Sequence, residues 1–291
     1  SAVSHQLQAL EDHLGVALVD HSRRPMTLTT RGVAYLRYTE EILELLERAS
    51  AEIVSDTPSS LRQLSFAMID DFESDVGPEI VRMLTTALPA CRLISYTRPS
   101  HEILTLLRDR ELDIGIATQP QTPIAKVEET PILRDPFVLA VPAVSHASGE
   151  EFVTSRSGLP FLRYSRDQIM GRMIDAQLAR LRLPLKASCE FDSTASIMAL
   201  VAEGHGWAIT TPATFSRSKR FRGQIKLLPF PRQTFARTIS VFLADPQAGE
   251  AARSVATALR SLLSIHTIAP MVLAYPWLGE SYRLFASPTN A

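Results

Sequence analysis

Polar side chains that could bind a small molecule follow a series of short apolar segments in this chain of 291 residues. The segments at 64–69, 92–96 and 112–117 have the length and composition of strands, and polar residues come directly after each of them. Ligands of open α/β sheets bind at the carboxyl ends of the strands, so these polar residues are candidates for one shared pocket. The candidates are Asp70, Asp71, Thr97, Arg98, Ser100 and Thr118 in the first half of the chain and Tyr164, Ser165, Asp192, Ser193 and Thr211 in the second.

The carboxylates among these candidates limit which ligand the pocket could hold. Asp71, if it faces the pocket, repels a carboxylate and favours a hydroxyl or an amine. With Asp70, Glu73 and Asp75 it places four carboxylates near one predicted helix N-terminus, where they could instead serve only to favour the helix dipole. We expect a ligand that is not a simple dianion, unless Arg98 turns into the pocket.

Catalytic and metal-binding patterns are missing from the sequence. There is no GxSxG, HExxH or P-loop motif, and the seven histidines are scattered without ligand spacing. Gly204-His205-Gly206 does not continue as a dinucleotide loop, because Ile209 stands where the third Gly belongs and the segment leads into a strand. We expect no enzyme activity, no catalytic residue, no metal and no cofactor.

The two cysteines lie far apart and show neither a CxxC pattern nor metal-type spacing. Cys91 and Cys189 each lie in an apolar stretch, which predicts two reduced, buried thiols, as in cytosolic proteins. No basic segment followed by an apolar run opens the chain, and no apolar run reaches the ~18 residues of a membrane span. We expect a cytoplasmic protein without a membrane partner.

Strand and helix patterns alternate at short intervals over residues 61–291, which is typical of βαβ units with a parallel sheet. A first series is followed by the loose segment 143–158 and then by a second series, and a late strand and helix lead back to the first. The sequence predicts an α/β fold of two lobes with the candidate pocket between them. The expected bounds are about 61–142 and 244–264 for lobe 1 and about 159–238 for lobe 2.

The first 31 residues have a different pattern, a helix followed by a hairpin. Apolar residues recur at spacings of four, three and four from Val3 to Leu14, which predicts one helical stripe, and Gly15 is typical of the position just after a helix. Two short apolar segments, 16–19 and 26–29, flank a polar turn and predict a pair of strands. This order is that of a winged helix-turn-helix, whose helix lies in the major groove while the wing contacts phosphate.

The charge distribution confines any contact with nucleic acid to a small part of the chain. The formal net charge of −1 gives no overall basic field. Residues 1–31 carry three basic and three acidic residues, whereas residues 32–57 carry two basic and six acidic ones. The residues that we expect to contact DNA are Ser1, Ser4, His5 and Gln8 on the helix and Arg23 and Arg24 in the wing.

The stretch SAVSHQLQALEDHLGVALVDHSRRPMTLTTRG resembles the recognition helix and wing of LysR-type transcriptional regulators. It departs from the family pattern at Val19, where Phe is usual, and at His21, where Arg is usual. The resemblance extends to about residue 264, with LRDRELDIGIAT and VAEGHGWAITTP as its best matches in the rest of the chain. The matching positions of the first stretch are Ser4, Leu7, Leu10, Glu11, Leu14, Gly15, Leu18, Arg24, Leu28, Thr29 and Gly32.

The resemblance implies that the first segment is only part of a DNA-binding domain. The family begins with one or two further helices, and a lone recognition helix cannot bury its apolar stripe without them. We expect about 20 to 30 residues to precede Ser1, from the size of a helix-turn-helix unit. The first 31 residues are thus interpreted as a partial winged helix-turn-helix.

A long helix is predicted next, from about Thr30 to Ser55, where no Pro interrupts an apolar stripe. It would be ~39 Å long, and a helix with such a narrow apolar seam normally packs against a twin. Residues 32–57 resemble the family's linker helix, which pairs two DNA-binding domains. Residues 56–60, DTPSS, break the helix and predict a hinge before the effector-binding domain, 61–291.

The resemblance further implies a regulator that binds double-stranded promoter DNA and changes conformation when a small effector enters the cleft between periplasmic-binding-protein-like lobes. A dimer, a tetramer and contact with RNA polymerase are expected from the family. Ser100 stands where the family often holds an effector oxygen, or it could be a plain N-cap. The alternative function is a solute-binding protein without a DNA role, which a secretion signal would distinguish.

Peroxide sensors of the family carry a reactive cysteine just before an RDQ-like segment. This chain has Tyr164-Ser165-Arg166-Asp167-Gln168 there, without a cysteine, so we expect no thiol switch. The apolar tail, 265–291, is unlike the usual family ending. It could cover a subunit interface or be unstructured.

Overall fold

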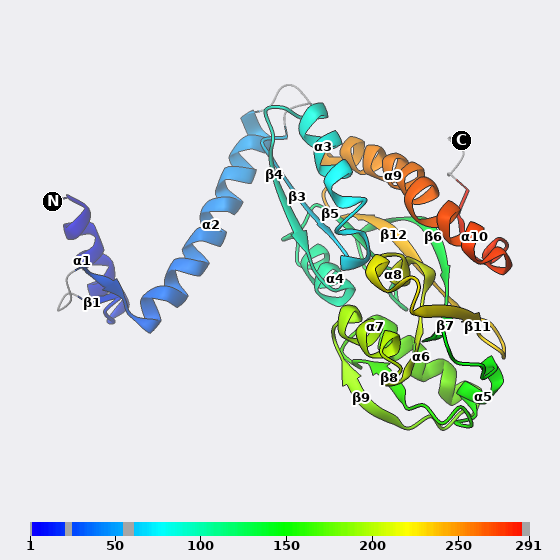
Figure 1. Cartoon of the computed structure of the whole chain (residues 1–291). Coiled ribbons are helices and arrows are strands. Elements are labelled where there is room, and N and C mark those ends of the chain that lie inside the picture. Colours follow the sequence, from blue (N-terminus) through cyan, green and yellow to red (C-terminus); the bar gives the residue numbers. More distant parts are fainter. Residues whose placement is uncertain (1, 21–24, 55–60, 287–291) are drawn as a thin grey trace. The chain divides into compact units, whose positions relative to one another are not determined.

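The computed structural model describes residues 2–20, 25–54 and 61–286. The chain forms two compact units, residues 1–60 and residues 61–291, which are described separately (Figure 1).

The first unit consists of a helix, a two-stranded hairpin and a long second helix. Its elements are α1 (Ala2–Leu14), β1 (Val19–Asp20), β2 (Thr27–Leu28) and α2 (Thr30–Val54). Gly15 follows α1 with a φ of +68°, a left-handed conformation in which Gly has no Cβ strain, and this explains why the helix stops there. The hairpin strands are shorter than predicted, because only Val19 and Asp20 pair with Leu28 and Thr27.

The second unit contains two mixed sheets, each in one lobe. The first sheet has the order β13-β6-β12-β5-β3-β4, and the second has the order β11-β7-β10-β8-β9. The strands of the first sheet are β3 (Gln63–Met68), β4 (Arg92–Thr97), β5 (Ile114–Thr118), β6 (Glu128–Pro136), β12 (Ala236–Leu243) and β13 (Arg283–Leu284). Those of the second are β7 (Val138–Pro142), β8 (Phe161–Tyr164), β9 (Ala187–Phe191), β10 (Trp207–Thr210) and β11 (Ile225–Pro229).

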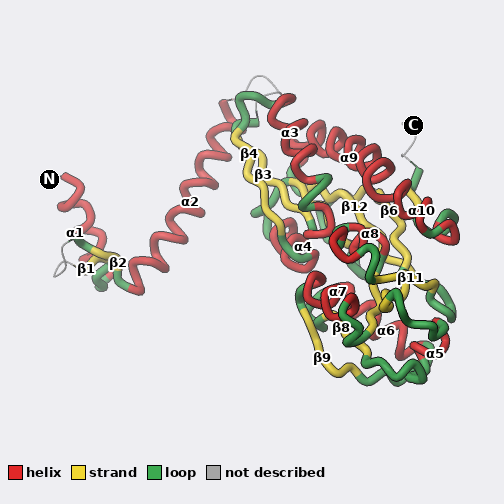
Figure 2. Tube along the Cα trace, viewed as in Figure 1, coloured by secondary structure: helices red, strands yellow, loops and turns green. Residues whose placement is uncertain are grey.

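Helices follow most of the parallel strands, as the alternating pattern predicted (Figure 2). In the first lobe α3 and α9 pack against each other, and α4 packs on β5 and β3. The α-helices are α3 (Gly77–Ala87), α4 (Ser100–Arg108), α5 (Gly149–Val153), α6 (Ile169–Arg180), α7 (Thr194–Ala202), α8 (Pro212–Ser216), α9 (Gly249–Leu263) and α10 (Ala269–Ala274). Shorter turns of 3₁₀ or π helix are η1 (Asp70–Phe72), η2 (Lys219–Phe221), η3 (Pro246–Ala248), η4 (Ser264–Ile268) and η5 (Pro276–Leu278).

The lobe boundaries differ from those predicted. The chain crosses to the second sheet at Phe137, between β6 and β7, so residues 138–142 belong to lobe 2 rather than lobe 1. It returns between β11 and β12, which places residues 236–243 in lobe 1. Strands β6 and β7 are separated by a single residue, Phe137, with no loop between them. A sequence pattern therefore could not show that consecutive strands join different sheets.

The tail is folded over its described part, 265–286, contrary to the alternative that it is unstructured. Strand β13 pairs antiparallel with β6 and covers that edge of the first sheet. The described residues include one helical stretch, Pro246–Ala274, that is long and apolar enough to cross a membrane. Its apolar residues Val255, Leu259 and Leu263 are fully buried in the first lobe, which is how a core helix of an α/β domain packs.

Candidate functional site

Glu11 joins the predicted recognition helix to the predicted wing. Its side chain is only 9% exposed, and one carboxylate oxygen, Oε1, accepts hydrogen bonds from the backbone N–H groups of Leu18 at 2.6 Å and Val19 at 2.9 Å. Charge-assisted hydrogen bonds of this kind are the stronger ones in proteins. In the sequence, Glu11 is one of the positions that match the family pattern, and in the structure its carboxylate positions the first strand of the hairpin.

The start of α2 is fitted closely to the same strand. Thr29 Oγ1 donates to the carbonyl of Ala17 at 2.8 Å and accepts from the N–H of Gly32 at 3.0 Å, as an N-cap does. A Cβ on Gly32 would lie 1.9 Å from the carbonyl oxygen of Leu18, so no side chain fits there. These contacts hold α1, β1 and α2 as one unit.

The predicted DNA contacts are placed only in part. Ser4, His5 and Gln8 are exposed on α1, as a recognition helix requires. Ser1, Arg23 and Arg24 lie outside the described residues, and so does His21.

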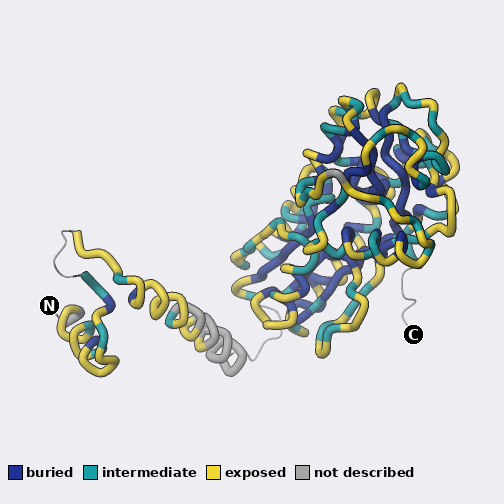
Figure 3. The backbone as a smooth tube through the Cα atoms, turned by 90° about the horizontal axis from the view of Figure 1, so that it is seen from below, coloured by how far each residue is buried: buried dark blue, intermediate teal, exposed yellow. Residues whose placement is uncertain are grey.

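Several large apolar residues of α2 are exposed. Figure 3 colours much of the described part of this helix as exposed. Leu36, Leu43 and Leu46 are among these apolar residues and lie on one side of the helix, at spacings of seven and three. A stripe of leucines is seldom left exposed in a soluble protein, which makes α2 a candidate for self-association.

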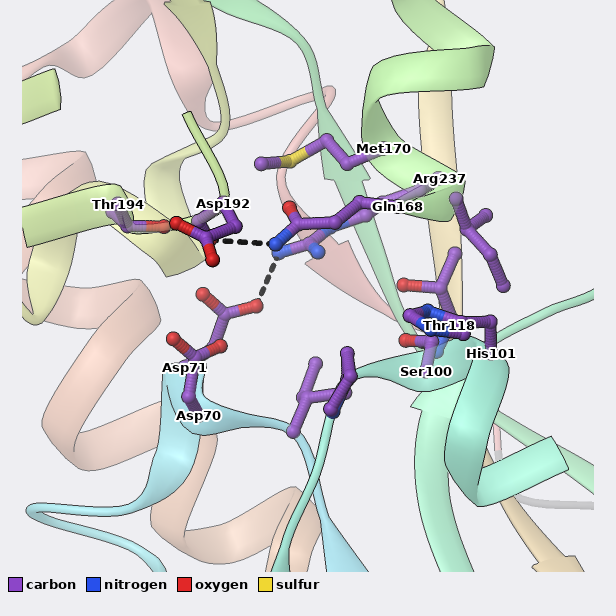
Figure 4. A pocket seen from close by; sticks show the side chains of 13 residues that line it. Asp70, Asp71, Ser100, His101, Thr118, Gln168, Met170, Asp192, Thr194 and Arg237 are labelled. Atoms are coloured by element: carbon purple, nitrogen blue, oxygen red, sulfur yellow. Dashed lines mark hydrogen bonds and ion pairs between the residues drawn. The ribbon is translucent and has the colours of Figure 1, made fainter. Parts of the chain in front are cut away.

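A cleft with about 450 Å³ of empty space, open to solvent, lies between the two lobes (Figure 4). First-lobe residues at the ends of β3 and β5 and the start of α4 face second-lobe residues at the starts of α6 and α7. Five of the predicted pocket residues line it, namely Asp70, Asp71, Ser100, Thr118 and Asp192. The other lining residues are Ile69, Pro99, His101, Gln168, Ile169, Met170, Thr194 and Arg237.

Six predicted residues do not line the cleft. Tyr164 is buried, with its hydroxyl 3.1 Å from Thr210 Oγ1, and burial raises its pKa to about 12. Arg98 has not turned inward, because its guanidinium lies 3.6 Å from the carboxylate of Glu102 and over the ring of Tyr96. The remaining ones are Thr97, Ser165, and the N-caps of α7 and α8, Ser193 and Thr211.

Ser100 is not the N-cap of α4, so the alternative that it is a plain N-cap was wrong. It is the first residue of the helix, and Pro99 occupies the cap position without a side-chain hydrogen bond. Ser100 Oγ instead accepts a hydrogen bond from the N–H of Thr118 at 3.1 Å. The contact ties the start of α4 to the end of β5 at the cleft.

A buried ion cluster lies at the back of the cleft. Arg237 is 4% exposed at its side chain, and it donates to Asp71 Oδ2 at 2.7 Å and to Asp135 Oδ2 at 2.8 Å. The side chains of Asp71 and Asp135 are 5% and 0% exposed. Arg237 Nη2 also lies 3.0 Å from Thr211 Oγ1 and 2.9 Å from Thr214 Oγ1. Asp71 therefore faces the cleft as a partner of Arg237 rather than as a lone carboxylate.

Burial and charge act in opposite directions on this cluster. Burial alone would lower the pKa of the Arg237 guanidinium, but the carboxylates of Asp71 and Asp135 raise it above the ordinary value. Burial raises the pKa of Asp135, and Arg237 counteracts part of that effect. The ion pair with Arg237 thus favours the charged form of Asp135, against its burial.

Sequence reasoning missed Arg237 for a topological reason. The rule used the carboxyl ends of strands, whereas Arg237 lies at the start of β12. Because β12 runs antiparallel to β5, its beginning lies beside the carboxyl end of β5. His101 and the residues at the start of α6 were within reach of the prediction, since they adjoin loops that it selected.

The other three carboxylates near η1, those of Asp70, Glu73 and Asp75, pair with basic residues of the second lobe. Arg217 bonds to Asp70 and lies 3.2 Å from Glu73, and Lys219 Nζ lies 2.6 Å from Asp75 Oδ1. These pairs join the segment around η1 to the segment after α8. All four carboxylates thus have cationic partners, from the second lobe for Asp70, Glu73 and Asp75 and from the first lobe for Asp71, so they do more than favour the helix dipole.

Neither cysteine is buried, so that prediction was wrong. Cys189 is exposed on β9, the edge strand of the second sheet, and Cys91 is partly buried. An edge strand leaves side chains open to solvent even when its sequence is apolar. Burial raises the pKa of the Cys91 thiol.

The comparisons with known proteins agree with the fold. Residues 59–264 match the LysR substrate binding domain model, and residues 1–33 match the model of the bacterial regulatory helix-turn-helix protein of the lysR family. The uncharacterized HTH-type transcriptional regulator YfeR of Shigella flexneri is 27% identical over 215 residues, 72% of this chain and 68% of that protein. A probable hydrogen peroxide-inducible genes activator of Mycobacterium leprae is 30% identical over 164 residues, 56% of this chain and 52% of that protein.

Solved structures share the architecture at low sequence identity. A Corynebacterium glutamicum OxyR mutant with bound hydrogen peroxide has a TM-score of 0.59 at 20% identity and covers 94% of this chain and 88% of its own. Full-length CbnR in complex with its target DNA has a TM-score of 0.60 at 17% identity and covers 90% of this chain and 89% of its own. At these identities, the similarity to both structures concerns the fold alone. Since family models match both the amino-terminal segment and the two-lobed domain, the chain belongs to the LysR family of bacterial regulatory helix-turn-helix proteins.

Proposed function

We propose that this DNA-binding transcriptional regulator reads promoter DNA with the outer face of α1 and responds to a small effector held between its lobes. The observation that carries the DNA contact is the arrangement around Glu11, which fixes the wing strand to α1 while Ser4, His5 and Gln8 stay exposed. A helix held in this way can enter a major groove without rotating about its own axis. Arg23 and Arg24 supply the local positive charge that the chain as a whole lacks.

Self-association through α2 is the second part of the proposal. The exposed leucines of α2 support pairing with the α2 of a second copy, and paired helices would set the distance between two DNA half-sites. A tetramer and contact with RNA polymerase follow the expectation for the family. A regulator of this kind acts in the cytoplasm, where the DNA is.

The effector site of the proposal is the inter-lobe cleft. Its walls come from both lobes, so a ligand that contacts both walls favours one arrangement of the lobes over others. The two chain crossovers, at Phe137 and between β11 and β12, are the places where the lobes could rotate.

DNase footprinting of the full-length protein tests the DNA-binding part. The target is the DNA that precedes its own gene and the divergent neighbouring gene, probed over a series of salt concentrations. We expect a protected region with two spaced half-sites that survives competitor DNA. Weak, salt-labile binding without a footprint would contradict the proposal for this DNA.

Two matched pairs of variants sharpen the test. Gln8→Ala should weaken the footprint by about tenfold or more, the effect of losing one base contact, whereas Gln6→Ala on the other side of α1 should not. Leu43→Glu should dissociate the dimer in analytical ultracentrifugation, whereas Tyr38→Glu, also exposed but on the other side of α2, should not. If Gln8→Ala and Gln6→Ala had equal effects, the proposed DNA-contacting face of α1 would be refuted. If Leu43→Glu and Tyr38→Glu had equal effects, the proposed pairing face of α2 would be refuted.

The solute-binding alternative has no comparable support. The amino-terminal segment matches a helix-turn-helix family model, and its elements pack as one structured unit. A transport protein has no use for either feature.

A further inference from the structure

The walls of the cleft fall into two chemically different sides (Figure 4). One side, the carboxylate side, is acidic. The other, the donor side, carries hydroxyl groups, a ring nitrogen and the first turn of α4. The carboxylate side consists of Asp70, Asp71 and Asp192, and the donor side of Ser100, His101 and Thr118.

The carboxylate side has more negative charge than its cations neutralise. Arg217 and Arg237 are the guanidinium groups in contact with it, and they already pair with Asp70, Asp71 and Asp135. The carboxylate of Asp192 has no hydrogen-bond or ion-pair partner among the described residues. The three carboxylates of this side, together with those of Asp135 and Glu73, thus stand against two guanidinium groups. A positively charged group on a ligand would be stabilised here, and an anion alone would be repelled.

The titration of Asp70 agrees with this charge surplus. Burial raises the pKa of Asp70, and the neighbouring charge of Asp71 raises it further, although Arg217 acts in the opposite direction. The charged forms of Asp70 and Asp71 repel one another, and a cationic group of a ligand placed beside them would stabilise both.

The donor side carries a buried polar atom without a protein partner. The Nδ1 atom of His101 is buried and has no hydrogen-bond partner among the described residues. Buried polar atoms are almost always hydrogen-bonded, so this atom at one wall of a cleft points to a ligand that bonds there. Thr118 also lines this wall and is 2% exposed, and no described residue bonds to its hydroxyl.

The first turn of α4 makes the donor side suitable for an anionic group. Pro99 occupies the N-cap and offers no side-chain acceptor, so the N–H groups of Ser100 and His101 lack the usual cap. The helix dipole adds a partial positive charge at this end of a helix of nine residues. A carboxylate would accept from these N–H groups and from the Thr118 hydroxyl.

We propose that the cleft binds a small zwitterion, an amino acid or a compound with the same pattern of charges. Its ammonium group would lie among the carboxylates of Asp71 and Asp192, and its carboxylate would lie at the start of α4 beside Thr118. The apolar side chains of Ile69 and Met170 remain for the rest of the ligand. This inference rests on the proposed role of the cleft as the effector site.

Isothermal titration calorimetry on the full-length protein tests the proposal, with each of the common L-amino acids as a separate probe. For the amino acid that binds most tightly, the matching amine without the carboxylate and the matching acid without the amine are titrated next. We expect each of the two truncated compounds to bind at least about tenfold more weakly, since each loses one charged end.

Variants assign the two ends of the ligand. Asp192→Asn should weaken binding of the amino acid by about tenfold or more and leave binding of the deaminated acid unchanged. Thr118→Val keeps the shape of the side chain and should weaken both. Asp109→Asn removes the same charge from an exposed residue just after α4 and should change neither.

Three results would overturn the proposal: no amino acid binds, the deaminated acid binds as tightly as the amino acid, or Asp192→Asn has no more effect than Asp109→Asn. Footprinting on the same preparation separates this failure from a failure of the proposed function. If the footprint is retained, only the zwitterion proposal is refuted and the proposed DNA-binding function stands. If both the footprint and amino-acid binding are absent, both proposals are refuted.

Discussion

Replacing Arg237 by Met removes the cation that bonds to both Asp71 and Asp135 and keeps the volume of the side chain nearly the same. The two carboxylates are 5% and 0% exposed, so water cannot take the place of the guanidinium. Loss of one partner of a buried ion pair costs about 3–5 kcal/mol. We expect the free energy of unfolding of the two-lobed domain to fall by that amount.

The same variant predicts a change in pH dependence. Without Arg237 the burial that raises the pKa of Asp135 is counteracted only by hydrogen bonds from Thr211 and the Ala213 N–H, and the folded state then takes up a proton more readily than the unfolded state. A carboxyl group whose pKa is higher in the folded state destabilises the fold at higher pH, and this penalty decreases as the pH falls. The difference between Arg237→Met and the natural protein should therefore be larger near pH 8 than near pH 5.

Urea unfolding followed by tryptophan fluorescence measures this difference. Both tryptophans, Trp207 and Trp277, lie in the two-lobed domain, so the signal reports that unit alone. The matched control is Arg82→Met, which breaks an exposed pair with Glu79 and should cost no more than about 1 kcal/mol. An effect of Arg237→Met as small as that of the control, or a loss that does not shrink at lower pH, would refute the reasoning.

Three further predictions concern single side chains. Glu11→Ala should destabilise the first unit by about 1–3 kcal/mol and speed proteolysis of the wing, because two buried N–H groups lose their acceptor, whereas the exposed Asp12→Ala should not. Tyr282→Phe should leave the urea midpoint unchanged or raised, since its buried hydroxyl has no partner among the described residues, whereas Tyr164→Phe should lower it. A thiol reagent should label the exposed Cys189 before the second cysteine, as mass spectrometry of the digested protein would show.

The elements that sequence patterns predicted well are those defined by local periodicity. The stripe from Val3 to Leu14 and the glycine after it placed α1 correctly, and the uninterrupted stripe after Thr30 placed α2 to within a residue or two. The βα alternation likewise predicts helices over 100–110 and 193–203, and α4 and α7 differ from these ranges only at their ends. In each case the residues that decide the structure are neighbours along the chain.

The features that sequence patterns missed depend on strand order. Strand β7 is paired by β10 and β11, which follow much later in the chain, and this decides that it belongs to the second lobe. The exposure of Cys189 depends on β9 being an edge strand, and the presence of Arg237 in the cleft depends on β12 being antiparallel. Pairings between distant segments leave no local periodic trace, so only the structure shows them.

The position of Arg237 connects the cleft to the chain crossovers. Asp135 lies two residues before the crossover at Phe137, and Arg237 lies just after the return into β12, so their ion pair spans both connections between the lobes. The same guanidinium holds Asp71, which lines the cleft. A ligand cation that approaches Asp71 therefore competes with the group that joins the two crossovers. We therefore expect contact at the cleft to influence the angle between the lobes through this one side chain.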